Sequence, residues 1–204
     1  MVRHQVVAAA VAALTLSLSV ASGSLAAAPG SVTAAQANAI VQRVFGATNP
    51  DAAYRALTSS EQRLFWLAET PSGSPTSVSS SAPMMGPLAA GGNWAITMYV
   101  FQNNAFGQRL WTYWQTLNWS SNGTTLTSYS ARKGPAEKMA GWTYTEIGGP
   151  TPITVAGGLG QSSVEVWGQG EFQFCMVGIC VQSYYPWVDE RGWASGTYTA
   201  NYGY

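Results

Sequence analysis

RLWTYWQTLNW, residues 109–119, is the stretch of sequence that decides the fold. Its large side chains recur at every second position, the spacing at which a β-strand places them on one face. One face would carry Trp111, Tyr113, Leu117 and Trp119, and the other Leu110, Thr112, Trp114 and Thr116. The pattern predicts a strand with aromatics on both sides. If Trp111, Tyr113 and Trp119 face inward, Trp114 faces outward; in the reverse register a row of three aromatics is exposed.

Short strands separated by Gly and Pro turns are expected on both sides of this segment. Residues 94–101 alternate in the same way, and Asn122-Gly123 is a hairpin turn signal leading into residues 124–129. Further strand candidates are 142–147, 153–156, 162–167, 171–177, 179–185 and 197–202. Residues 132–138 read as a charged loop, and 168–170 and 189–191 as turns. Residues 91–204 are therefore predicted to form an antiparallel β domain, either a sandwich or a barrel.

The N-terminal part has helical signals instead. Thr33 can cap a helix over residues 34–45, Pro50 suits a first helical turn, and Thr58 with Glu61 forms a capping box. We expect residues 29–70 to be a helical segment packed on the sheet, giving an α+β fold with short N-terminal helices followed by a predominantly antiparallel sandwich or barrel. Residues 71–90 are rich in Ser and Pro and are predicted to be a linker or loop.

Residues 1–28 have the three parts of a secretory signal peptide. Arg3 supplies the positive charge, residues 6–20 are mostly apolar, and the small residues at 26–28 offer a cleavage site before Pro29. The apolar stretch is too short and too interrupted for a membrane anchor. We therefore predict a secreted protein that leaves the membrane after cleavage, and the Ala-rich leader indicates a bacterial source.

The only histidine, His4, lies in this leader. The secreted protein would lack the commonest general base and the usual zinc ligand, so no metal site is predicted. Without Arg3 the chain carries eight Lys and Arg against nine Asp and Glu, a net charge near −1. No basic stripe marks a nucleic-acid surface, and no glycine-rich phosphate loop or other cofactor motif is present. No cofactor is predicted.

Two cysteines, Cys175 and Cys180, remain in the mature chain. A close, even pair in an oxidising compartment predicts a disulfide, here at the end of a β-hairpin with Gly178 in the turn.

The aromatic residues are the strongest hint of function. All nine Trp and all ten Tyr lie beyond the leader, more than one core accommodates. An exposed indole or phenol ring beside uncharged Asn, Gln and Thr side chains suits the apolar face and the hydroxyls of a sugar. The ligand-binding candidates are Trp111, Tyr113, Trp114, Trp187 and Trp193. They predict a non-catalytic binding protein for cell-wall or environmental glycans, and packing of aromatic residues in the core is the competing interpretation.

Two other functions stay open. A histidine-free hydrolase would use two carboxylates about 5 to 10 Å apart. Its weak catalytic candidates are Glu146, Glu165 and Glu171, with Glu165 and Glu171 meeting across a hairpin turn at 168–170. The other alternative is an inhibitor or effector that binds an extracellular protein, which would need a contiguous exposed apolar patch. The sequence favours binding over catalysis.

Overall fold

The computed structural model describes residues 33–84, 91–176 and 178–204. This part of the chain begins with three helices, α1 (Ala34–Phe45), α2 (Pro50–Arg55) and α3 (Ser59–Glu69). The strands that follow are β1 (Thr76–Met84), β2 (Gly92–Asn103), β3 (Arg109–Ser121), β4 (Leu126–Lys138), β5 (Trp142–Ile147), β6 (Ile153–Gly157), β7 (Ser163–Met176), β8 (Ile179–Tyr184), β9 (Trp187–Trp193) and β10 (Tyr198–Gly203). The predicted signal peptide lies outside the described residues.

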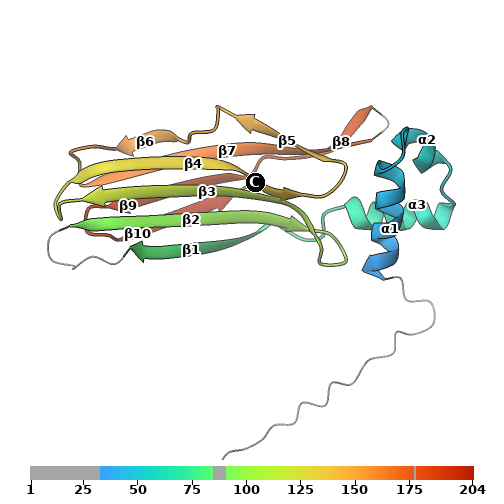
Figure 1. The fold of residues 1–204 in the computed structure, drawn as a ribbon, viewed down its shortest axis with the longest axis horizontal. Helices are drawn as coiled ribbons and strands as arrows, with labels where there is room; N and C mark the ends of the chain where they lie inside the picture. The colour runs from blue at the N-terminus through green and yellow to red at the C-terminus, as the bar shows by residue number, and fades with distance from the viewer. Residues whose placement is uncertain (1–32, 85–90, 177) are drawn as a thin grey trace, which may run out of the picture. The chain divides into compact units, whose positions relative to one another are not determined.

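The strands form two antiparallel sheets that face each other (Figure 1). One sheet has four strands in the order β1-β2-β3-β4. The other is built around the 14-residue strand β7, with β5 and β6 along one edge, β8 and β9 along the other, and β10 beside β9. The two sheets do not close into a barrel, so the predicted α+β fold is confirmed in its sandwich form.

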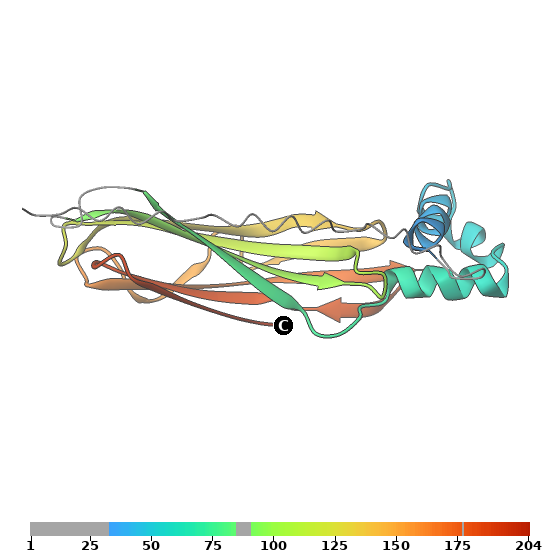
Figure 2. The same cartoon turned by 90° about the horizontal axis from the view of Figure 1, so that it is seen from below.

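The three helices cover one end of the sandwich (Figures 1 and 2). Thr33 and Thr58 form capping boxes at the starts of α1 and α3, and Pro50 lies in the first turn of α2. Phe65 and Trp66 of α3 then pack on Phe174 of β7, with ring centroids 6.3 and 5.8 Å apart. Helices this short gain most of their stability from such packing, so their position depends on the sheet.

The space between the sheets holds two apolar clusters. The cluster next to the helices includes Trp111 and Phe172, whose rings stack with centroids 4.8 Å apart. The second cluster lies farther along the same strands and contains Leu117, Trp119 and Val164. Between the two clusters, inward positions on β3, β4 and β9 are polar.

Three polar side chains occupy this middle layer: Gln115 of β3, Lys133 of β4 and Glu190 of β9. The Gln115 amide nitrogen donates to the Glu190 carboxylate at 3.3 Å, and the Lys133 ammonium donates to the main-chain carbonyls of Ile147 and Gln169. Gly168 of β7 makes room for them, because a Cβ there would lie 2.3 Å from Gln115 Oε1. The layer therefore ties the sheets together by hydrogen bonds where apolar packing is interrupted.

Several segments differ from the sequence predictions, and the differences share a cause. Residues 132–138 belong to β4, 168–170 lie inside β7, and 189–191 lie inside β9. Charge and glycine predict turns there, but the buried Lys133 and Glu190 have hydrogen-bond partners on the opposite sheet. The glycines Gly168 and Gly170 face bulky side chains. Within the Ser/Pro-rich 71–90 segment, residues 76–84 form β1, an edge strand that pairs, among the described strands, with β2 alone. An edge position tolerates Pro83 because only one side of the strand needs ladder donors.

We predict that stability falls as pH rises through the neutral range. Glu69 and Glu190 are fully buried, and desolvation raises the pKa of each from 4.5 to about 8. Between these pH values the folded protein holds protons that the unfolded chain releases. The free energy of unfolding then drops by up to ~1.4 kcal/mol per pH unit for each group. Thermal unfolding followed by circular dichroism should give a melting temperature that declines from about pH 4.5 to pH 8.

Glu190→Gln should remove about half of this decline, because one of the two carboxyl groups no longer titrates. Glu137→Gln, at a side chain that is 59% exposed, is the matched control and should leave the decline unchanged. A Glu190→Gln protein with the wild-type pH dependence would contradict the assignment.

Candidate functional site

The outer surface of the six-stranded sheet combines aromatic and hydrogen-bonding side chains. Burial alternates strictly along β7 and β9, so the odd-numbered residues of both strands face away from the core. We call their central part the tryptophan face; it consists of Glu165, Trp167, Trp187, Asp189, Arg191 and Trp193. Trp167 lies beside Asp189 across the ladder, and Glu165 beside Arg191. The face is therefore built on two neighbouring strands rather than on loops.

Trp187 lies across a glycine of the neighbouring strand. It pairs with Gly203 of β10, and a Cβ on Gly203 would lie 2.5 Å from the indole ring. The ring thus covers the bare backbone of β10, a known way to support a glycine near a sheet edge. Because one side of the ring rests on backbone, its other side is turned away from the sheet.

Charged groups lie between Trp187 and Trp193. Arg191 forms an ion pair with Glu165, and its guanidinium carbon lies 5.7 Å from the centroid of the Trp193 ring. Desolvation, followed by the nearby Glu165 carboxylate, raises the pKa of Asp189. The two acids and one arginine form a compact polar group that can donate and accept hydrogen bonds beside the rings.

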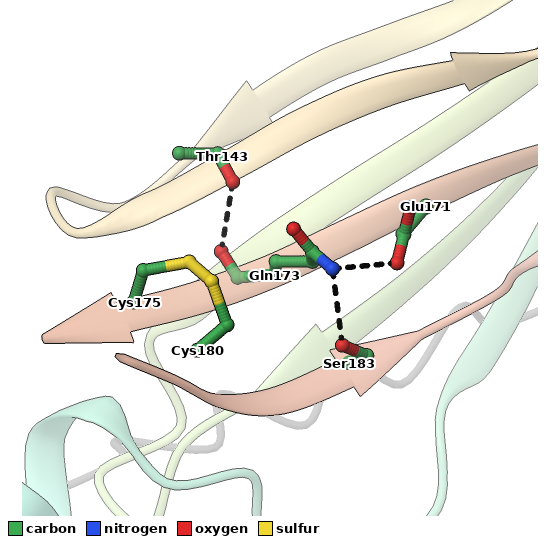
Figure 3. The surroundings of a disulfide bond; sticks show 6 residues. All are labelled: Thr143, Glu171, Gln173, Cys175, Cys180 and Ser183. Atoms are coloured by element: carbon green, nitrogen blue, oxygen red, sulfur yellow. Dashed lines mark hydrogen bonds between the residues drawn. A yellow bond between two sulfur atoms is a disulfide. The ribbon is translucent and has the colours of Figure 1, made fainter. Parts of the chain in front are cut away.

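The face continues toward the disulfide through uncharged and acidic side chains (Figure 3). Gln173 donates to Glu171 at 2.7 Å and to Ser183 at 3.5 Å, while Thr143 donates to the Gln173 carbonyl. Tyr185 is 44% exposed, and its hydrogen bond with Glu171 raises the pKa of its phenol. Fixed acceptors thus extend along β7 beyond the tryptophans.

The disulfide at this end joins β7 and β8. Cys175 and Cys180 are bonded, as the sequence predicted, and close the hairpin (Figure 3). A cross-link over so short a loop stabilises the fold by about 2 kcal/mol in chain-entropy terms.

The predicted aromatic candidates fall into two groups. Trp111 and Tyr113 are fully buried, so they belong to the core and do not reach a surface ligand. Trp114 faces outward from the four-stranded sheet, which resolves the register of residues 109–119. Trp187 and Trp193 face outward from the other sheet. The three outward candidates therefore lie on two opposite surfaces.

The three candidate glutamates do not come together. The turn expected at 168–170 does not exist, and Glu165 and Glu171 are six residues apart on one strand, about 20 Å along it. Glu146 of β5 is exposed and pairs with Gly170. Burial raises the pKa of Tyr113 and Tyr144, and the Glu146 charge adds to both shifts. The hairpin geometry on which the Glu165–Glu171 hydrolase depended is wrong.

Sequence reasoning missed Asp189 and Arg191 as surface partners. The run Asp189-Glu190-Arg191 predicts a solvated turn, because two adjacent acids usually mark one. The available signal was Val188, which with Glu190 and Gly192 continues an alternating inward set. Partners on the opposite sheet, Gln115 and the backbone of Met98, explain why that set contains a carboxyl group.

The described residues were also searched for metal-binding clusters and membrane-spanning helices. No group of three or more His, Cys, Asp or Glu side chains in them could hold a metal ion. No helix in the same ranges is long and apolar enough to cross a membrane. The molecule is thus an antiparallel sandwich with a helical cap and an aromatic, polar outer face. Comparison with protein-family models, curated proteins and solved structures found no match.

We predict that Glu165→Gln lowers the pKa of Asp189. The substitution removes the negative charge of Glu165, which raises the pKa of Asp189. The positive charge of Arg191, which lowers that pKa, is then no longer neutralised by Glu165. Both changes favour the ionised form of Asp189. The measurement is a carboxyl-carbon NMR titration of wild type and variant. Glu171→Gln, on the same strand but farther from Asp189, is the control; an unchanged Asp189 titration in Glu165→Gln would rule out the coupling.

Proposed function

We propose that the protein is a secreted, non-catalytic glycan-binding protein that uses the tryptophan face. The observation that carries the proposal is the outward row on β9, in which Trp187 and Trp193 flank Asp189 and Arg191, with Trp167 alongside on β7. Aromatic rings suit the apolar C–H faces of sugars, and the carboxylate and guanidinium groups suit sugar hydroxyls. Trp187 and Trp193 are about 20 Å apart along the strand, which favours a ligand of several sugar rings.

The arrangement of the carboxyl groups on this face favours a binding role over hydrolysis. Glu165 contacts Arg191 and influences the neighbouring Asp189, while Glu171 is bound by Gln173. Each of these carboxyl groups is engaged with a neighbour on a sheet surface. A glycosidase instead needs two carboxyl groups on opposite sides of the scissile bond.

Binding should be tested on insoluble peptidoglycan, chitin and cellulose with purified residues 29–204. We expect saturable retention on one of these glycans and an increase of about tenfold in Kd for Trp187→Ala and for Trp193→Ala, equivalent to ~1.4 kcal/mol each. Leu159→Ala is the matched control, because Leu159 is a large apolar side chain that is 63% exposed outside this face.

Retention that both tryptophan variants preserve would refute the assignment of the face. Release of soluble sugar during the incubation would move the assignment to a hydrolase. Retention on none of the three glycans would sink the ligand class and favour a protein partner, for which Ile153, Val155 and Leu159 offer exposed apolar side chains.

Secretion has its own test. The disulfide supports an oxidising compartment, and the pattern in residues 1–28 predicts cleavage before Pro29. Expression of the full chain in a secreting bacterial host should yield an extracellular protein whose N-terminal residue, read by mass spectrometry, is Pro29. A cell-retained protein that keeps residues 1–28 would contradict the prediction.

A further inference from the structure

The four-stranded sheet presents a second aromatic surface on the opposite side of the sandwich. Tyr99 of β2, Trp114 of β3 and Gly134 of β4 form one cross-strand row. Tyr99 is 36% exposed, and the Trp114 indole lies over Gly134, where a Cβ would meet it at 3.7 Å. This arrangement repeats that of Trp187 over Gly203, so both sheets expose an indole laid across a glycine of the neighbouring strand.

A shallow hollow of about 380 Å³ lies on one side of this aromatic pair. Its outward-facing lining includes Asn93, Asn118, Ser120, Ser128 and Ser130, which offer amide and hydroxyl groups only. Their strands hold them in register, and Ser120 donates to Asn93 at 2.5 Å. The lining therefore matches a ligand that carries hydroxyl groups and no charge.

A second hollow, of about 420 Å³, lies on the other side and includes Tyr99 in its lining. Here the Arg109 guanidinium carbon lies 3.4 Å from the centroid of the Phe101 ring. Arg109 also donates to Asn103 and Thr112, at 3.0 and 3.2 Å. The arginine is thus held against an aromatic ring. Glu137 also lines this hollow and pairs with Arg109 at 3.7 Å, so the two charges at this end of the surface offset each other.

The cross-strand row between the first hollow and the aromatic pair is also polar, and its side chains are held by a hydrogen bond. Thr97 and Thr116 lie between Asn118 and Trp114 in the ladder, and their hydroxyl oxygens share a hydrogen bond of 2.7 Å. Over these rows the outward side chains of β2 and β3 are uncharged, and Arg132 of β4 lies at the margin. The tryptophan face, in contrast, carries Glu165, Asp189 and Arg191 at its centre, between the tryptophan side chains. An uncharged ligand therefore suits the second surface better than a charged one.

We infer that the outer surface of β2, β3 and β4, centred on Tyr99 and Trp114, is a second binding surface for a neutral polysaccharide. The two apolar clusters fill the space between the sheets, so this surface and the tryptophan face point in opposite directions. A rigid chain bound on one surface does not reach the other, and one molecule bridges two polysaccharide chains. The inference rests on the proposed function, which it extends from binding to cross-linking.

A bridging assay tests it with the whole mature protein. Particles of the insoluble glycan that retains the protein are loaded, washed and then offered fluorescent hydroxyethyl cellulose or glycol chitin. Wild type should bind the particles and capture the soluble polymer. Two single variants of this surface, Trp114→Ala and Tyr99→Ala, should keep at least half of the particle binding. The amount of soluble polymer that each captures should fall about fivefold or more. Leu159→Ala should retain both activities.

The outcomes separate the two proposals. Particle binding by wild type without capture of either polymer overturns bridging and leaves the proposed function standing. Capture that Trp114→Ala and Tyr99→Ala both preserve overturns the location of the second surface. Absence of particle binding by wild type overturns the proposed function together with the inference. Circular dichroism of each variant confirms that lost capture is not lost folding.

Discussion

The packing of β3 against β7 is the constraint on which the rest of the structure depends. The inward side chains of β3 are large at both ends, Trp111 and Trp119, and polar in the middle at Gln115. The facing strand β7 has apolar residues at its ends and Gly168 opposite the Gln115 side chain. This pairing of side chains between β3 and β7 accounts for three features of the fold. They are the two apolar clusters, the buried polar residues Lys133 and Glu190, and the packing of α3 on Phe174. Shape and polarity together therefore determine one register between the sheets.

The same strands supply both the core and the surfaces. On β9, Glu190 points inward to Gln115 while Asp189 and Arg191 point outward on the tryptophan face. Binding groups on strands locked by a packed interior hold their positions more accurately than groups on loops. Under the proposed function, a glycan that meets such a face would lose little free energy in ordering it.

Local patterns in the sequence predict most of the fold but little of the site. The alternation in residues 109–119, the helix caps at Thr33 and Thr58, and the close pair Cys175 and Cys180 are encoded by near neighbours, and the structure has all three. The sequence did not reveal that Gly168 and Lys133 lie inside strands, because their reasons for being there are residues distant in the chain. The composition of the tryptophan face was not predictable for the same reason, because the pairing of β7 with β9 is what brings Glu165 next to Arg191.

The burial of Lys133 has a practical consequence for how the molecule is attached to a support. The chain contains two lysines, and the ammonium of Lys133 is bound by two carbonyls inside the sandwich, whereas Lys138 at the end of β4 is exposed. Amine-reactive reagents consequently meet one lysine side chain besides the amino terminus. Molecules coupled through Lys138 would share one orientation, and a fluorescent dye on Lys138 would report from a known position at the end of β4.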